Sequence, residues 1–250
     1  MIEWQGKRYW IIGAGSALGR ALADQLSRVG AELVLTSSDL AAMEQLAELL
    51  PGKAEALEAD VSDPGAMRAG AAKAGTVDGV IYLPDGEGGF GASNWDTAEI
   101  ERVIDRNLKG ALNTVGAVLP GMVKADSGHL LLVAGLSAYR GLPGEIGYGT
   151  SMAAIMHLAE ELYADLRNTG VNVQLACPGH VIAADPLEHG DTPAALPPSV
   201  MTADAAAREL FEHMNDEVFQ KSFPTMRGWV VRLSQLMPNW LYYRLFRSQL

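Results

Sequence analysis

A glycine-rich turn, written Gly13-Ala14-Gly15-Ser16-Ala17-Leu18-Gly19, is the first place where residue type and spacing could do chemistry. It follows an apolar run at 7–12 and precedes a helical pattern that begins at Ala21. Backbone N–H groups in such a turn, aided by the dipole of the following helix, can bind a pyrophosphate. A tight turn that binds nothing is the plain alternative.

Titratable side chains supply the second set of candidates. Asp85 and Glu87 lie on a glycine-rich loop after an apolar run at 77–83, and either carboxylate could act as a base. His180 follows a Pro-Gly pair and could take the same role, although a surface position is the simpler interpretation. The remaining histidines show no metal-ligand spacing and are interpreted as structural. They are His129, His157, His189 and His213.

Short apolar runs alternate with longer amphipathic segments, which predicts strands separated by helices. Runs such as Leu130-Leu131-Leu132-Val133 suit strands that are buried on both faces. Right-handed crossovers then give a doubly wound, Rossmann-like parallel sheet with helices on both faces. Ligands bind such sheets at the carboxyl ends of the strands, where the glycine turn and the acidic loop both fall. The predicted strands are 7–12, 31–36, 54–59, 77–83, 129–134 and 171–177, with a possible last one at 217–223.

Further motifs follow the glycine turn in a fixed order along the chain. They are Ala59-Asp60-Val61, Asn107-Leu108-Lys109-Gly110, Gly141-Leu142-Pro143-Gly144, Tyr148 and Cys177-Pro178-Gly179-His180-Val181. Together they resemble the short-chain dehydrogenase/reductase family over residues 8 to about 185. The turn itself fits the family pattern G-x-x-x-G-x-G with Ala17 in place of the middle glycine, whereas G-x-G-x-x-G would require a glycine at Leu18.

The resemblance implies an oxidoreductase that uses a nicotinamide dinucleotide, NAD(P)(H), and a small-molecule substrate. It implies that Tyr148 exchanges a proton with the substrate oxygen and that Asn107 positions a water-linked proton relay. A packed aromatic and a helix-kink cap are the alternatives for these two residues, and a simple turn is the alternative for Pro178-Gly179. The expected cofactor-binding residues are Gly13, Gly15, Ser16, Ala17, Leu18, Gly19, Ser37, Ser38, Asp60, Val61, Pro178, Gly179 and Val181.

Four positions depart from the family pattern, and all four belong to the nicotinamide or substrate side. Gly135 stands where the family has a serine, and Met152 stands where it has the lysine of Tyr-x-x-x-Lys. Tyr82-Leu83-Pro84-Asp85 replaces the N-N-A-G stretch, and Ala183 replaces a threonine. The adenine and pyrophosphate half lacks only one glycine. We interpret this as an altered reaction centre on a fold that still binds a dinucleotide.

The lost lysine and serine have a calculable cost. A tyrosine with a pKa of about 10 is phenolate in only about one molecule in a thousand near pH 7, and the lysine ammonium would have favoured that form. Acid–base help is worth about a hundredfold to ten-thousandfold. Ser137 lies two residues past the expected serine on the same loop and could replace its hydroxyl. A solvent-facing loop serine is the alternative.

The residues that usually decide between NAD and NADP, directly after the second predicted strand, are absent from this sequence. Ser37 stands where relatives that prefer NAD place an acid, and Ser38 stands where relatives that prefer NADP often place an arginine. Serine hydroxyls can bind either a 2′-hydroxyl or a 2′-phosphate, so both cofactors stay open.

The segment 221–250 differs from the rest of the chain, which we divide into a dinucleotide-binding part, 1–220, and this extension of the same domain. It carries five basic residues and no acid, so its charge is +5 while the rest carries −16. It also holds six aromatics: Phe223, Trp229, Trp240, Tyr242, Tyr243 and Phe246. Two short helices separated by Pro238 are predicted. A peripheral membrane contact, a cover for the substrate cleft, a subunit contact and packing on the acidic body are all open.

Composition limits the remaining possibilities. The net charge of −11 over 250 residues argues against a nucleic-acid binder. The lone Cys177 cannot form an intrachain disulfide and suggests no oxidising compartment. No apolar stretch reaches the roughly 18 residues of a membrane span. We therefore expect a cytoplasmic protein, membrane-associated only if the tail binds lipid, with no metal site.

Two functions follow. The first is an atypical oxidoreductase that acts on a carbonyl or alcohol, with Tyr148 as acid/base, Asn107 in the relay and Ser137 in place of the lost serine. The second is a catalytically silent dinucleotide-binding or scaffold subunit that pairs with an active relative. Both allow a homo- or hetero-oligomer through the long helices predicted at about 96–123 and 146–168.

Overall fold

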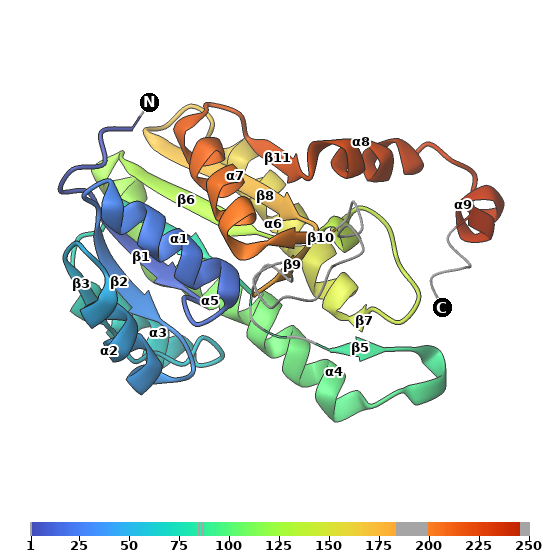
Figure 1. The fold of residues 1–250 in the computed structure, drawn as a ribbon, viewed down its shortest axis with the longest axis horizontal. Coiled ribbons are helices and arrows are strands. Elements are labelled where there is room, and N and C mark those ends of the chain that lie inside the picture. The colour runs from blue at the N-terminus through green and yellow to red at the C-terminus, as the bar shows by residue number, and fades with distance from the viewer. Residues whose placement is uncertain (1, 85, 87, 184–199, 246–250) are drawn as a thin grey trace, which may run out of the picture.

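The computed structural model describes residues 2–84, 86, 88–183 and 200–245. Within these residues, seven strands form one sheet in the order β3-β2-β1-β4-β6-β8-β11, and all neighbouring pairs are parallel (Figure 1). The strands are β1 (Arg8–Ile12), β2 (Glu32–Thr36), β3 (Ala54–Ala56), β4 (Gly79–Tyr82), β6 (Gly128–Val133), β8 (Val171–Pro178) and β11 (Gln220–Phe223). Every strand predicted from the sequence is present, so the doubly wound parallel sheet is confirmed.

Helices cover both faces of this sheet, and each face has its own apolar core. On one face the core is completed by α1 (Ala17–Arg28), α2 (Leu40–Leu49) and α7 (Ala203–Asn215). On the other face it is completed by α3 (Pro64–Ala74), α5 (Gly110–Ala125) and α6 (Tyr148–Leu166). The central strands are apolar on both sides because both faces are buried.

The helix predicted at about 96–123 has an irregular centre. It consists of α4 (Thr97–Ile104), a π-helical turn (Asp105–Lys109) and then α5. Single π turns inside α-helices often mark functional sites. Here the turn contains Asn107, one of the predicted site residues.

Short elements connect the loops at the carboxyl end of the sheet. Strand β5 (Gly89–Phe90) pairs antiparallel with β7 (Ile146–Gly147), directly before α6. Strand β9 (His180–Ile182) pairs with β10 (Val200–Thr202) after β8. Two 3-10 turns, Ala92–Asn94 and Leu136–Ala138, complete these loops. The pairing of β5 with β7 fixes the loop that leads into α6.

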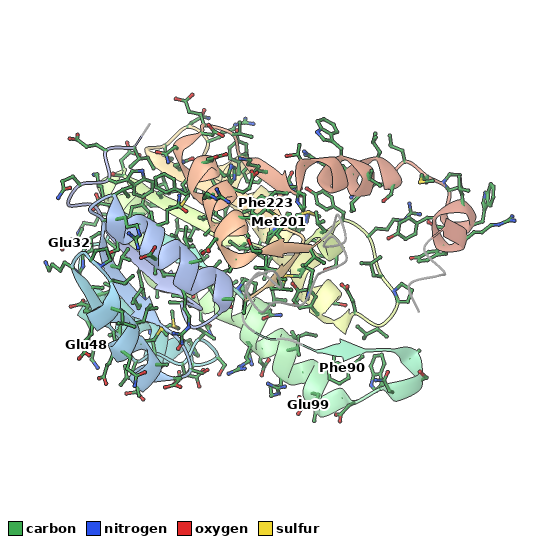
Figure 2. All side chains as sticks on the ribbon, viewed as in Figure 1. Glu32, Glu48, Phe90, Glu99, Met201 and Phe223 are labelled. Carbon is green, nitrogen blue, oxygen red and sulfur yellow. The ribbon has the colours of Figure 1, made fainter. Side chains whose placement is uncertain are left out.

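The C-terminal extension leaves the sheet after β11, whose last residue Phe223 is labelled in Figure 2. It forms α8 (Thr225–Ser234) and α9 (Asn239–Leu245), and Pro238 lies between them as predicted. Residues 221–223 belong to β11, so the part outside the sheet begins at Pro224. The two helices extend from the carboxyl end of the sheet, at the right of Figure 1.

Arg140 joins this extension to the loop after β6. Its guanidinium donates hydrogen bonds to the carbonyl of Ser234, to the carbonyl of Met237 (3.1 Å) and to Oδ1 of Asn239 (2.6 Å). It also lies 4.0 Å from the ring centre of Tyr242. The large apolar side chains on the outer side of the extension are exposed: Trp229, Val230, Leu233, Leu236, Trp240 and Tyr243. Among the described helices, none is long and apolar enough to cross a membrane.

Candidate active site

The glycine turn between β1 and α1 is tightly packed against its neighbours. Gly13 has φ +82°, and a β-carbon there would stand 2.1 Å from the Leu83 carbonyl oxygen. A β-carbon on Gly19 would stand 2.6 Å from the Gly13 carbonyl oxygen. Both positions therefore require glycine, whereas Ala17 and Leu18 lie in the first turn of α1.

The first turn of α1 presents free backbone donors. Ser16 caps the helix by accepting the Gly19 N–H on its hydroxyl at 3.0 Å, and its carbonyl accepts the Arg20 N–H at 2.9 Å. The first N–H groups of any helix have no partner within the helix. Those of Ala17 and Leu18 have no acceptor among the described residues and lie at the positive end of the helix dipole, which suits an anion such as a pyrophosphate.

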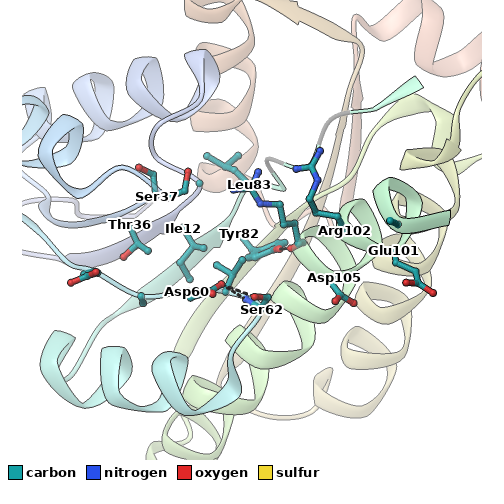
Figure 3. Close-up of a pocket in the computed structure, with 17 residues that line it drawn as sticks. Ile12, Thr36, Ser37, Asp60, Ser62, Tyr82, Leu83, Glu101, Arg102 and Asp105 are labelled. Carbon is teal, nitrogen blue, oxygen red and sulfur yellow. Dashed lines mark hydrogen bonds between the residues drawn. The ribbon is translucent and has the colours of Figure 1, made fainter. Parts of the chain in front are cut away.

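A cavity of about 570 Å³ opens beside this turn (Figure 3). It brings together Gly13, Ser37, Ser38, Asp60 and Val61, all of which the sequence had placed in the cofactor site. Asp60 accepts hydrogen bonds from the N–H and hydroxyl of Ser62 at 2.9 and 2.7 Å. These bonds, followed by the charge of Arg106, lower the pKa of the Asp60 carboxyl.

Charged side chains of α4 and the π turn line the opposite wall of the cavity, and sequence reasoning missed them. Arg102 and Arg106 contribute two guanidiniums, and Arg102 also bonds Glu99 at 2.8 Å. Arg102 and Arg106 precede Asn107 by five residues and by one, on the same predicted helix, which is the signal that could have identified them. The carboxylates that line the same cavity are Glu58, Asp60, Glu101 and Asp105.

Tyr148 begins α6 and faces the loop after β6. A β-carbon added to Gly135 would stand 3.1 Å from the Tyr148 hydroxyl and 3.5 Å from the Ser137 hydroxyl. Ser137 is buried, and its Oγ has no hydrogen-bond partner among the described residues. The structure thus brings Tyr148 and Ser137 to one point, the position where the family pattern has its serine side chain.

Met152 fills the position of the expected lysine. It is fully buried in the apolar core, and its Cγ stands 3.6 Å from the position of a Gly135 β-carbon. A thioether adds bulk and no charge at this point.

Asn107 is fully buried in the π turn and braces Tyr148 indirectly. Its amide donates to the Gly86 carbonyl at 2.9 Å and to the Ser151 hydroxyl at 3.0 Å, while its Oδ1 accepts the Gly86 N–H at 2.8 Å. Ser151 in turn donates to the backbone carbonyl of Tyr148 at 2.7 Å. The side chain of Asn107 is therefore occupied by protein groups, and it links the loop after β4 to the start of α6.

Tyr82, one of the four departures, is packed under the same turn. Its hydroxyl donates to the carbonyls of Arg106 and Asn107 at 2.6 and 3.0 Å. A β-carbon on Gly110 would stand only 2.4 Å from this oxygen. Gly110 thus leaves the space that the Tyr82 hydroxyl occupies. A larger residue at position 110 would clash with Tyr82.

The Pro-Gly segment after β8 lies at the same end of the sheet. Gly179 donates its N–H to the Phe223 carbonyl at 2.7 Å, and Val181 packs on the apolar core from β9. Pro178 is buried at the end of β8, while His180 and Ala183 are exposed. The exposed position of His180 agrees with the simpler interpretation given above.

The other titratable candidates separate into three cases. Asp85, Glu87 and His189 lie outside the described residues. His157 is exposed on α6 near Glu160 and Glu161. His129 and His213 are buried, and burial lowers the pKa of each to about 4. Within the described part of the chain, no group of His, Cys, Asp or Glu side chains could hold a metal ion.

Glu145, three residues before Tyr148, is a further residue that the sequence analysis passed over. Its Oε2 is buried and has no hydrogen-bond partner in the part of the chain that the structure describes. A β-carbon on Gly149 would stand 3.8 Å from this oxygen and 3.8 Å from the Ser137 β-carbon. An acid just before the tyrosine, on the loop that closes the site, was the available signal.

Comparison with known proteins agrees with this geometry. Residues 7–186 match the family described as short chain dehydrogenase. The chain belongs to the short-chain dehydrogenase family. It is 31% identical to an uncharacterized oxidoreductase of Myxococcus xanthus, over 97% of both chains. It is 35% identical to the oxidoreductase UcpA of Salmonella typhimurium, over 70% of each.

Among solved structures, a short chain dehydrogenase/reductase from Burkholderia phymatum in complex with NAD is similar, with a TM-score of 0.82. It is 25% identical, and the match covers 94% of this chain and 95% of that one. The short-chain dehydrogenase fold implies a nicotinamide dinucleotide. The glycine cradle, the open N–H groups of α1 and the adjoining cavity fit that group.

Proposed function

We propose that this protein is an atypical short-chain oxidoreductase that interconverts a carbonyl and an alcohol with NAD(H). One observation supports it above the others: the hydroxyls of Tyr148 and Ser137 lie within 3.1 and 3.5 Å of the point where the family's serine side chain would begin. A buried hydroxyl without a partner, such as that of Ser137, is costly unless a ligand or water satisfies it.

The residues of the chain divide the work of reduction as follows. A dinucleotide held by the glycine turn and by the cavity beside Ser37, Ser38 and Asp60 would supply the hydride for the carbonyl carbon. Ser137 donates a hydrogen bond to the carbonyl oxygen as negative charge develops there. Tyr148 then gives its proton to that oxygen, and the reverse steps serve alcohol oxidation. Asn107 is a positioning residue, because it holds Ser151 and through it the backbone of Tyr148.

The absence of the family's lysine affects the expected rates of carbonyl reduction and alcohol oxidation differently. With Met152 in place of the lysine, the phenolate of Tyr148 lacks the stabilisation that the lysine ammonium would give it. Reduction, in which the tyrosine starts as a neutral acid, suffers less than oxidation, in which it must first be a base. We therefore assign the protein a stronger activity in the direction of carbonyl reduction.

The charges of the cavity favour NAD(H) over NADP(H). Four carboxylates and two guanidiniums line it, and the end of β2 contributes only the hydroxyls of Ser37 and Ser38. A 2′-phosphate would add about two negative charges next to this acidic wall, whereas a 2′-hydroxyl can bond serines and carboxylates.

An oligomer is part of the proposal. The outer face of α5 carries Leu112, Gly116, Pro120 and Val123, all exposed, at helical spacing. Tyr163 of α6 is exposed as well. Such an apolar helix face is typical of a subunit contact. This face could form the contact in a homodimer. It could equally form the contact in the alternative function, in which a catalytically silent subunit pairs with an active relative.

The exposed apolar side chains of the extension support a peripheral contact with a membrane as a subsidiary proposal. Trp229 of α8, Leu236 of the connection and Trp240 of α9 are exposed, and the segment carries no acid. Co-sedimentation with anionic vesicles, compared with neutral ones, tests it. If the protein stays in the supernatant to the same extent with anionic and with neutral vesicles, the membrane contact is refuted.

The main test is NADH oxidation over a panel of carbonyl compounds, with the wild type and Tyr148→Phe side by side. Turnover that the phenylalanine variant loses supports the oxidoreductase. Turnover that survives in the variant removes Tyr148 from the mechanism. NADH binding without any turnover, together with a co-purifying relative, favours the silent subunit.

A further inference from the structure

Glu145 lies on a loop that is held rigidly at both ends. Its carbonyl accepts the Gly149 N–H at 2.8 Å, so it joins the first turn of α6. The next residues, Ile146–Gly147, pair with β5, and Arg140 at the start of the loop is bound to the C-terminal extension. The backbone of Glu145 is thereby fixed beside the start of α6.

The carboxylate is also incompletely paired. Three buried side-chain atoms lack a hydrogen-bond partner within the described residues: Ser137 Oγ, Glu145 Oε2 and His213 Nδ1. Glu145 Oε2 and the Ser137 side chain lie on the same side of the start of α6, because a β-carbon on Gly149 would stand 3.8 Å from Glu145 Oε2 and 3.8 Å from the Ser137 β-carbon. His213 belongs to α7 on the other face of the sheet. Ser137 Oγ and Glu145 Oε2 are thus two buried oxygens without a hydrogen-bond donor, near the proton donor Tyr148. Buried polar atoms normally have a partner, so we interpret these two as the place of a substrate group that donates hydrogen bonds.

In the described part of the chain, no Lys, Arg or His side chain forms a salt bridge with Glu145. The nearest guanidinium on its loop, that of Arg140, is occupied by Ser234, Met237 and Asn239 and lies over Tyr242. The family's lysine is Met152. Among the described residues, Glu145 thus has no salt-bridge partner, which favours a cationic substrate group over a carboxylate or phosphate at this carboxylate.

We propose that the substrate is a vicinal amino ketone or amino alcohol and that Glu145 binds its ammonium group. An ammonium has three donors, so it can bond Glu145 Oε2 and the lone pair of Ser137 Oγ together. The Ser137 hydroxyl proton stays available for the neighbouring oxygen of the substrate, which faces Tyr148. The inference rests on the proposed function, since it names the substrate class of the same site.

The test compares two ligands that differ in one group. Calorimetric titration of the protein in the presence of NAD⁺ measures binding of 1-amino-2-propanol and of 1,2-propanediol. We expect the amino alcohol to bind at least tenfold more tightly. Glu145→Gln should lose that preference, and Glu161→Gln, a matched change on the exposed side of α6, should keep it.

Equal affinity for the two ligands, no binding of the amino alcohol, or an unchanged preference in Glu145→Gln would each overturn the inference. The comparison of ligands on the wild type stands even if the glutamine variant does not fold. Turnover of neutral ketones without an amine preference leaves the oxidoreductase intact and refutes the amine site. An amine preference without any hydride transfer supports the amine site and refutes the oxidoreductase.

Discussion

The hydroxyl of Tyr148 lies opposite the bare α-carbon of Gly135, 3.1 Å from where a β-carbon would be. That spacing is tighter than most contacts of real β-carbons, so a serine at 135 would require a small shift of the tyrosine. The observed position of the Tyr148 hydroxyl therefore depends on the absence of a side chain at Gly135. Ser137 approaches the same point from two residues further along the loop.

Removing the Ser137 hydroxyl tests whether it acts on the substrate. We expect Ser137→Ala to lower kcat by about a hundredfold to a thousandfold, because an oxyanion donor contributes on that scale. Steady-state kinetics with any ketone that the wild type reduces gives the value. Ser127→Ala, which alters an exposed serine directly before β6 at the amino end of the sheet, is the control. An unchanged kcat in Ser137→Ala would assign the loop serine no part in the reaction.

Met152→Lys should destabilise the protein while improving the site. The side chain is fully buried among apolar groups, so an ammonium there costs at least about 3 kcal/mol in the free energy of unfolding. Thermal melts with and without NADH measure the loss and its partial recovery. Met152→Leu, similar in volume, should cost under about 1.5 kcal/mol.

The double variant Gly135→Ser with Met152→Lys extends this prediction. A gain of ketone reduction over both single variants would show that the rest of the site is competent. If no gain appears in a folded double variant, the coordinated Tyr82 and Gly110 become the residues that limit the chemistry.

Cofactor preference can be reversed at the end of β2. The wild type should bind NADH at least tenfold more tightly than NADPH, and Ser38→Arg should narrow or invert that ratio by pairing with the 2′-phosphate. Fluorescence titration of both cofactors gives the four constants. Ser93→Arg adds the same charge elsewhere and should leave the ratio alone. Tighter binding of NADPH by the wild type would contradict the charge argument.

Acid should destabilise the fold through two buried histidines. Their pKa is about 4 in the folded chain, because burial disfavours the imidazolium, and about 6.5 when unfolded. Between these values the unfolded chain binds protons that the folded chain does not. The free energy of unfolding therefore falls as pH drops from about 6.5 toward 4, by on the order of 3 kcal/mol per histidine.

Denaturant unfolding at a series of pH values measures this slope. His129→Gln should make it shallower. His157→Gln, which alters an exposed histidine, should leave it unchanged. The same slope in all three proteins would mean that other groups govern acid stability.

The contact of Arg140 with the extension predicts a local effect on stability. Arg140→Ala removes hydrogen bonds to Ser234, Met237 and Asn239 and the contact with the Tyr242 ring, so we expect a loss of about 1–3 kcal/mol. Limited proteolysis should then cut within 224–245 first. Arg167→Ala, at the end of α6, is the control. Cleavage that begins elsewhere would place the weak point outside this contact.

The sheet and its helices were predictable because apolar runs and turn glycines report local structure directly. Gly13 and Gly19 are fixed by close backbone contacts, and such positions leave a clear mark in the sequence. The strands buried on both faces, such as Gly128–Val133, do the same. Predicted and observed elements therefore agree within a few residues.

The reaction centre was only partly predictable because its parts meet through tertiary contacts. The link from Asn107 to Tyr148 passes through Ser151, and nothing in the spacing of these residues announces it. Arg102 and Arg106 enter the cavity only because α4 and the π turn present them there. The unpaired oxygen of Glu145 is a property of burial, which a local pattern does not report.

Cys177, the single cysteine of the chain, has a practical consequence. It is fully buried at the end of β8, and burial raises the pKa of its thiol to about 12. At neutral pH it is therefore neither accessible nor a thiolate, the form that reacts. A cysteine introduced on the exposed face of α9, for example at Trp240, would be the one thiol open to a maleimide dye. The native sequence is thus already a suitable background for spectroscopic labels that report the position of the C-terminal helices.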